Sequence, residues 1–447
     1  MLALIAAYAV VVAGASCWVA RGLRGPEDFL MGRQGLGVAQ GIGLFGGIFL
    51  GATAVGVVGQ GYQRGVAGGI LDLALGLGFG ILSLTLLKRM RSSGHSSLVA
   101  LLRAHYGPSA GVIGALVVGG AWLMLLAAFM AAAGVALEQL SGLSQVLCTA
   151  VTVVILLLYA MPGGMRAVTA TNLAHLAALA VLMAVLSVLA LGHAAIRTPH
   201  HQGSSSWGYL VGVLLLSAPT TVVAPDVMMG IGALRTLAAA RRTLALVVVL
   251  LTCGGLALAL LGGRAEHLVS VADPDYALPR LIALLLPSGL AMGGILLLFG
   301  AALTGAVAEV MVCTFLLSEQ VTAWRGRTGR PALGLATIRL QMTCIAVLAG
   351  VAALADAHVV GLVLTAFRVF VPGIVPQAVL ALLGRNTRPH AVVASMIAGP
   401  ATCLAVAWAM PGLEETPADP VLWGTLVAAG ILAAGHLPRR RARLHEE

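Results

Sequence analysis

The sequence predicts an all-α membrane protein that crosses the bilayer many times. Three observations support this: the composition, the length of the apolar runs and the placement of the basic residues. Of the 447 residues 60% are hydrophobic and 9% are charged, and the mean hydropathy is +1.01. Because soluble globular domains carry about 25% charged residues, the composition excludes an ordinary water-soluble protein.

Thirteen apolar runs predict transmembrane helices, each of which needs roughly 17–25 residues to span the hydrocarbon core. Helices are favoured over barrel strands because the runs are long and do not alternate between polar and apolar residues. The runs cover approximately residues 2–20, 36–62, 66–87, 110–137, 144–161, 168–193, 207–229, 238–262, 284–318, 336–355, 359–383, 391–410 and 420–436.

The basic residues predict the orientation. Of the 26 Lys and Arg residues, 21 lie in alternate loops on one side of the thirteen runs, four lie in the other loops, and Arg368 lies inside a run. The positive-inside rule then places the N-terminus outside and the C-terminus in the cytoplasm. We expect a multi-pass protein of a bacterial inner membrane, in contact with the lipid bilayer. The net charge of +10 follows from this loop pattern and does not indicate nucleic acid.

The sequence gives no sign of an enzyme or of a bound cofactor. All six cysteines lie in apolar runs without CxxC spacing, so disulfides and cysteine metal sites are not expected. No cluster of nucleophile, base and acid, no metal-ligand spacing and no Gly-rich phosphate loop is present.

Two of the predicted helices are expected to be interrupted. Residues 37–69 have a glycine every one to five positions, which indicates either close helix packing or a broken helix that coordinates an ion or solute. The run from Trp207 contains Pro219 and Pro225, and proline removes a backbone donor and clashes with the preceding turn. The second predicted break therefore lies between these prolines.

Six segments in the correct order resemble the sodium/solute symporter family, the group that contains the proline, pantothenate and sugar symporters. The most specific is YAMPGGMRA at residues 159–167, which is similar to the end of the family signature. The others are EDFLMGRQGLG (27–37), GATAVGVVGQGYQRG (51–65), HSSLVALLRAHYG (95–107), PDVMMGIGALRTLAAARR (225–242) and VPQAVLALLGRNTRPHAVVASMIAG (375–399).

The resemblance implies a fold of two inverted five-helix repeats and secondary transport by alternating access. Residues 1–35 would form an extra helix and loop, 36–194 the first repeat, 195–384 the second repeat, and 385–447 two further helices with a basic tail. The implied coupling ion is sodium, held between the first broken helix and the run at 284–318.

The chain departs from the family at this ion site. Gly305 and Ala306 occupy the positions of two hydroxyl residues, and Asn172 stands where many relatives have Asp. Glu309 follows on the same helical face, and could bind sodium, carry a proton or serve as a structural partner of an Arg or a helix end. The ion-coupling candidates are Glu309, Gly305, Ala306, Phe49, Ala52 and Asn172.

The solute and gate candidates surround the two predicted breaks. Arg368 either binds an anionic group of the solute or pairs internally with Glu309 or Asp226. Trp207 is expected to anchor at a membrane face and His175 to be a packing residue. The solute candidates are Thr53, Gln60, Tyr62, Thr220, Thr221 and Arg368, and the gate candidates are Asp226 and Asp72.

We therefore expect a secondary active transporter that imports a small polar organic solute together with sodium or a proton. A carboxylate-bearing solute is favoured by Arg368 alone. We expect a monomer or a weak homo-oligomer. The alternatives are an uncoupled facilitator or exchanger, and a solute-binding membrane sensor with the same fold.

Overall fold

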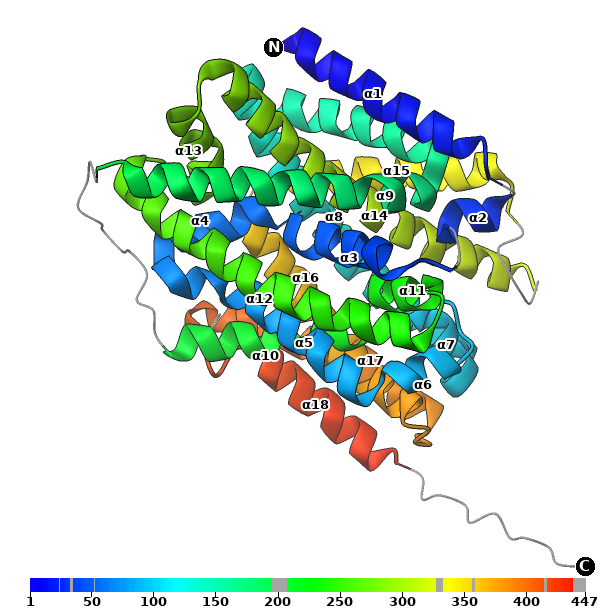
Figure 1. Ribbon diagram of the computed structural model, residues 1–447. Helices are drawn as coiled ribbons and strands as arrows, with labels where there is room; N and C mark the ends of the chain where they lie inside the picture. The colour runs from blue at the N-terminus through cyan, green and yellow to red at the C-terminus, as the bar shows by residue number, and fades with distance from the viewer. Residues whose placement is uncertain are drawn as a thin grey trace, which may run out of the picture.

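The described residues form a bundle of helices (Figure 1). The computed structural model describes residues 1–23, 25–32, 35–51, 53–194, 207–326, 333–355, 358–413 and 416–436. Within these residues, ten helical segments are long and apolar enough to cross a membrane. The predicted multi-pass, all-helical membrane architecture is confirmed, whereas the total of thirteen crossings stays a prediction.

The helices follow the apolar runs closely. In the first part of the chain they are α1 (Leu2–Ala20), α2 (Pro26–Met31), α3 (Val38–Gly46), the π-helical turn η1 (Gly47–Gly51), α4 (Ala54–Arg64), η2 (Gly65–Gly69), α5 (Ile70–Thr85), α6 (Leu87–Ser92), α7 (Leu98–Tyr106), α8 (Pro108–Ser141) and α9 (Gln145–Gly192).

In the second part they are α10 (Trp207–Val223), α11 (Pro225–Ala233), α12 (Leu237–Leu268), η3 (Pro274–Tyr276), α13 (Ala277–Leu285), α14 (Ser288–Trp324), α15 (Leu335–Ala355), α16 (Val359–Leu382), α17 (Pro389–Ala409), η4 (Pro411–Leu413) and α18 (Pro420–Ala434). The sequence did not predict η3 and α13, because α13 is too short to match a membrane-spanning run.

The helix α14 occupies the centre of the bundle, where it packs against α8 and α9. In its most apolar window 89% of the residues are buried, compared with 17% in α1 at the edge. An α-helix that is apolar all round is expected to be buried on every side. Figure 1 shows α1 and α18 at opposite edges of the bundle; α1 packs along α9, and α18 packs against α16 and α17.

Both predicted breaks are present. The first is η1, a turn of π-helix between α3 and α4, and such turns often occur at functional sites. The second is at Ala224, which has extended backbone (φ −54°, ψ 142°) directly before Pro225, the first residue of α11. Pro225 causes this break because proline disfavours helical backbone in the residue before it. Pro219, the other predicted breaker, lies inside α10.

Glycine also allows close helix packing, the other use expected of it. A Cβ atom at Gly61 would lie 2.4 Å from the carbonyl oxygen of Ala259, and one at Gly262 would lie 2.2 Å from that of Val58. The backbones of α4 and α12 therefore approach one another at positions where only glycine fits. Both uses of glycine occur in the same stretch of the chain.

The helix α9 contains two of the predicted runs, which are separated by a kink at Gly164. This residue has a φ of +55°, and a Cβ there would lie 2.3 Å from the carbonyl oxygen of Phe29. Left-handed backbone costs a residue with a side chain about 1–2 kcal/mol. The kink therefore requires glycine for both conformational and steric reasons.

We predict that Gly164→Ala destabilises the protein by more than that backbone cost, because the added methyl group also meets the chain at Phe29. The measurement is the apparent Tm of purified protein in detergent. The control is Gly119→Ala in α8, where a Cβ would have no neighbour within 4 Å. Equal Tm values for the two variants would contradict the role assigned to the kink.

Candidate functional site

Glu309, near the middle of α14, is fully buried within the protein and does not face lipid. Neither carboxylate oxygen has a hydrogen-bond partner in the described part of the chain. The indole N–H of Trp122 on α8 interacts with the carboxylate, although the two groups do not reach hydrogen-bond geometry. A carboxylate in hydrocarbon costs at least about 2.5 kcal/mol and needs a compensating interaction.

Asp226 is the acidic group that interacts with Glu309. It lies in the first turn of α11, just after the break at Ala224, and is almost fully buried. The two carboxylates are close enough to repel one another when both are charged, and neither oxygen of Asp226 has a hydrogen-bond partner among the described residues. The N-terminal end of α11 partly favours negative charge at Asp226. A cation bound at either acid would relieve this repulsion.

Trp122 was not predicted and belongs to this site. Its side chain is buried, and its ring lies edge-on to that of Phe370 on α16, with the ring centroids 4.7 Å apart. Aromatic residues that anchor a membrane protein lie near the bilayer faces. The position of Trp122 well inside a predicted run was the sequence signal that could have identified it.

A small cavity adjoins Asp226. Its volume is about 20 Å³, enough for one water molecule. The two broken helices surround it together with α9 and α14. The lining residues are Met31, Leu36, Leu44, Ile48, Met165, Thr169, Asp226, Met229, Gly230, Ala233, Ala308 and Val312. A larger cavity of about 570 Å³ lies between α10, α16 and α18, and its mainly apolar lining includes neither Asp226 nor Glu309.

The two broken helices are joined at both of their ends. At the end formed by α3 and α11, the backbone N–H groups of Gly35 and Leu36 donate to the carbonyl of Ala233, at 2.8 and 2.9 Å. At the end formed by α4 and α10, the Tyr209 hydroxyl donates to Gln60, at 3.3 Å. The region between the breaks is therefore bridged on both sides.

The expected sodium position is built around η1. Asn172 is buried against Gly47, since a Cβ at Gly47 would lie 2.9 Å from the amide nitrogen Nδ2. Neither amide atom of Asn172 has a hydrogen-bond partner in the described chain. Gly305 and Ala306 are buried on α14 and contribute no side-chain oxygen. Phe49 lies in η1, and Ala52 lies outside the described residues.

Asp72, a predicted gate residue, is fully buried in the first turn of α5. Its Oδ1 atom is 3.4 Å from the hydroxyl of Thr53, and its Oδ2 atom has no hydrogen-bond partner in the described part of the chain. On its other side is Gly255 of α12, where a Cβ would lie 2.4 Å from the Cβ of Asp72. Asp72 therefore lies between the first break and α12.

The remaining solute candidates make contacts within the protein. The Thr221 hydroxyl donates to the carbonyl of Leu75, at 2.9 Å, and that of Thr220 to the carbonyl of Leu216, at 3.4 Å. The Tyr62 hydroxyl donates to the carbonyl of Val269. These contacts do not bring the candidates together around one cavity, so their solute-binding roles stay predictions.

Two further residues have the surroundings expected of them. His175 Nδ1 is 3.1 Å from the carbonyl oxygen of Thr171, one turn earlier in α9, and its ring packs against Gly300. Trp207 is 82% exposed at the start of α10. His175 thus has a backbone partner, and Trp207 points away from the bundle.

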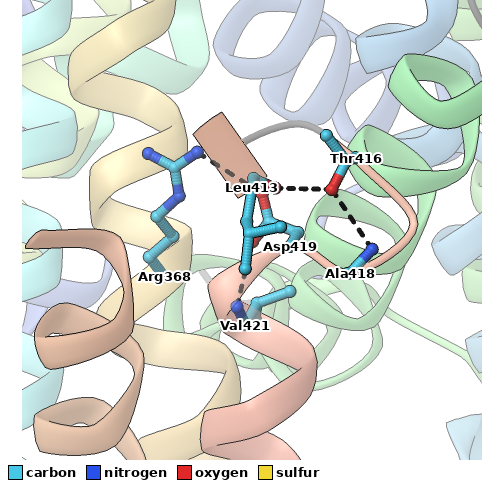
Figure 2. A network of polar contacts seen from close by, with 6 residues as sticks. All are labelled: Arg368, Leu413, Thr416, Ala418, Asp419 and Val421. Atoms are coloured by element: carbon cyan, nitrogen blue, oxygen red, sulfur yellow. Dashed lines mark hydrogen bonds and ion pairs between the residues drawn. The ribbon is translucent and has the colours of Figure 1, made fainter. Parts of the chain in front are cut away.

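Arg368 pairs with neither Glu309 nor Asp226, contrary to the internal pairing considered from the sequence. Its guanidinium Nη2 is 3.4 Å from Oδ2 of Asp419, which directly precedes α18 (Figure 2). Oδ1 of the same carboxylate accepts from the backbone N–H of Val421, at 2.9 Å. The sequence reading missed Asp419 because it placed this residue in a loop, whereas the chain folds back to bury it.

Comparisons with known proteins support the fold. No family model matches the sequence, and no curated protein matches it. A Na+-coupled sialic acid symporter in a substrate-bound outward-open state has a similar structure, with a TM-score of 0.76 at 14% identity, and the match covers 97% of this chain and 96% of that one.

Two other transporters are also similar. A nucleobase-cation-symport-1 family transporter, closed with bromovinylhydantoin bound, matches with a TM-score of 0.60 at 13% identity over 92% of this chain and 94% of that one. A manganese transporter of Eremococcus coleocola matches with a TM-score of 0.57 at 15% identity over 92% and 94%. Matches at these identities show a shared fold, which confirms the predicted inverted-repeat architecture; the repeat boundaries stay predictions.

We predict that Arg368→Met and Asp419→Asn each destabilise the protein, whereas the double variant recovers most of the loss. Breaking a buried ion pair typically costs about 3–5 kcal/mol, because a buried charge loses this partner, and replacing both members is often nearly neutral. Asparagine retains the oxygen that caps α18. The measurement is chemical unfolding in detergent, and additive losses in the double variant would contradict this prediction.

Proposed function

We propose that the protein is a secondary active transporter that couples uptake of a small polar organic solute to a cation bound at the Glu309–Asp226 pair. The observation that carries this proposal is the position of that pair, buried on the central helix and beside the second break. The fold shared with cation-coupled symporters supports it. We assign the chain to the sodium/solute symporter type on the six segments quoted above.

The physical argument is that the pair needs a cation. Two carboxylates that interact in a low-dielectric interior cannot both stay ionised without one. A bound proton or sodium ion removes the repulsion, and its release restores it. Binding therefore favours a conformation that keeps the pair together, and release favours one that opens the site, as alternating access requires.

The surroundings favour a proton over sodium. Sodium, like other hard cations, needs several oxygen ligands, and Gly305 and Ala306 supply none from their side chains. Asn172 retains one amide oxygen beside η1, so sodium stays the second candidate. The absence of side-chain hydroxyls at Gly305 and Ala306 also supports an alternative function, that of an uncoupled facilitator.

We place the solute between the two broken helices, with the end formed by α4 and α10 facing outward. This follows from the positive-inside rule, with the protein in a bacterial inner membrane, its N-terminus outside and its C-terminus in the cytoplasm. The cavity at Asp226 then lies toward the cytoplasm, where Asp226 would form part of the inner gate. We no longer favour an acidic solute, because that preference rested on Arg368, which pairs with Asp419.

We predict that Glu309→Gln abolishes solute accumulation driven by an ion gradient but retains solute exchange. The amide cannot bind or release a proton, whereas the solute site is left in place. The measurement is uptake into proteoliposomes from a pooled panel of labelled sugars, amino acids, carboxylates and amides, under an imposed sodium or proton gradient. Exchange is measured with the same solutes on both sides.

The matched control is Cys313→Ser, one turn further along α14, which keeps both acids. Accumulation should persist in this variant. Unchanged accumulation by Glu309→Gln at every pH would refute the proposal. If a sodium gradient alone stimulated accumulation by the wild type, the coupling ion would be sodium and not a proton.

A further inference from the structure

Asp72 lies outside the Glu309–Asp226 pair and is another buried acid of the predicted repeats. Its partner Thr53 directly precedes α4 and sits at the first break. The Thr53 hydroxyl also donates to the carbonyl of Phe49 in η1, at 2.6 Å. The acid, the hydroxyl and the carbonyl thus form a chain that leads from α5 into the break.

The distances assign the hydrogen of the Thr53 hydroxyl. A threonine hydroxyl has one hydrogen to donate and two lone pairs that accept. The 2.6 Å contact to Phe49 lies in the usual range for an O–H···O hydrogen bond, and the 3.4 Å contact to Asp72 is longer than that range. The hydrogen therefore belongs to the bond with Phe49, and Thr53 presents a lone pair to Asp72.

An ionised Asp72 would then be a buried carboxylate without a donor. A protonated Asp72 can point its hydrogen toward the free lone pair of Thr53, across a separation of 3.4 Å that makes this contact weak. The protonated form also avoids the cost of a buried charge that lacks a partner. Burial without a strong donor therefore favours the acid over the anion.

The packing leaves little room for a larger ion. A Cβ at Gly255 would be 3.0 Å from Oδ2 of Asp72, so the backbone of α12 closes that side. The side-chain oxygens at the site are those of Asp72 and Thr53, and the Phe49 carbonyl already accepts from Thr53, which leaves few ligands for a hard metal cation.

No charged side chain compensates the carboxyl in the described part of the chain. Beyond Thr53, no titratable group of η1, η2, α10 or α12 is a partner of Asp72 there. Cys253, the titratable residue nearest to Gly255 on α12, is exposed. Tyr209 of α10 is engaged with Gln60 and Arg64.

We propose that Asp72 is a second proton-binding site of this protein, with Thr53 as the acceptor of its hydrogen bond. The proton is taken from water and returned to it, so no other reactant is needed. Asp72 lies toward the end formed by α4 and α10, which the proposed orientation places outside. Movement of α4 away from α5 would separate Thr53 from Asp72 and expose the acid to external water.

The test is infrared spectroscopy of the full-length protein in liposomes, which needs neither a solute nor transport. A protonated carboxyl has a C=O stretching band that is separate from the amide and carboxylate bands. We expect Asp72→Asn to remove one such band from the spectrum at neutral and alkaline pH. Glu309→Gln, recorded in parallel, should leave that band in place, which separates the two sites.

The Thr53 variants test the hydrogen bond. Thr53→Val should shift the Asp72 band because its acceptor is lost, whereas Thr53→Ser, which keeps a hydroxyl, should leave the band where it is. The proposal is overturned if Asp72→Asn removes no band from well-folded protein. It is also overturned if sodium added at constant pH abolishes the band, because Asp72 would then bind a metal cation. Neither result depends on the outcome of the uptake experiments.

Discussion

The cost of a carboxylate in the bilayer interior explains much of the arrangement of this protein. Glu309 can be kept at mid-membrane only where protein surrounds it. Accordingly α14, which carries it, packs against α8 and α9 and is the most deeply buried of the candidate spans. The apolar faces of peripheral helices such as α1 are left for lipid. Glu309 thus lies on the candidate span that protein surrounds most completely.

Four of the buried acids divide into two kinds. Asp419 has a basic partner in Arg368 and lies outside the two predicted repeats, between α16 and α18. Asp72, Asp226 and Glu309 lie within the repeats, and none of them is hydrogen-bonded to a basic side chain in the described part of the chain. A paired charge holds helices together, whereas an acid without a basic partner can gain and lose a cation. This difference is why we assign structure to the first kind and function to the second.

The breaks and the acids depend on one another. A helix can be interrupted in the membrane only where the freed backbone groups find partners inside the protein. The Thr53 hydroxyl provides such a partner for the carbonyl of Phe49 at the first break, and Pro225 has no N–H to satisfy at the second. Each break in turn places an acid beside it, Asp72 at the first and Asp226 at the second. The helix breaks and the acids proposed to bind cations therefore lie at the same positions.

The sequence by itself determined the membrane-embedded helical class, the approximate positions of the helices and both breaks. These depend on composition, run length and the local effects of glycine and proline, which act over a few residues. It also singled out Glu309, because an acid in a long apolar run is conspicuous in any fold.

Only the tertiary structure decided the partners. Arg368 was expected either to bind the solute or to meet Glu309 or Asp226, but the turn before α18 brings Asp419 to it. Trp122 was not predicted to belong to the site, because it is one aromatic residue in an apolar run. Packing nevertheless places it beside Glu309. Asp72 was predicted to be a gate residue, and the structure adds that Gly255 and Thr53 enclose it. Which residues meet across helices depends on the rotation and depth of each helix, and these are set by the packing of the whole bundle.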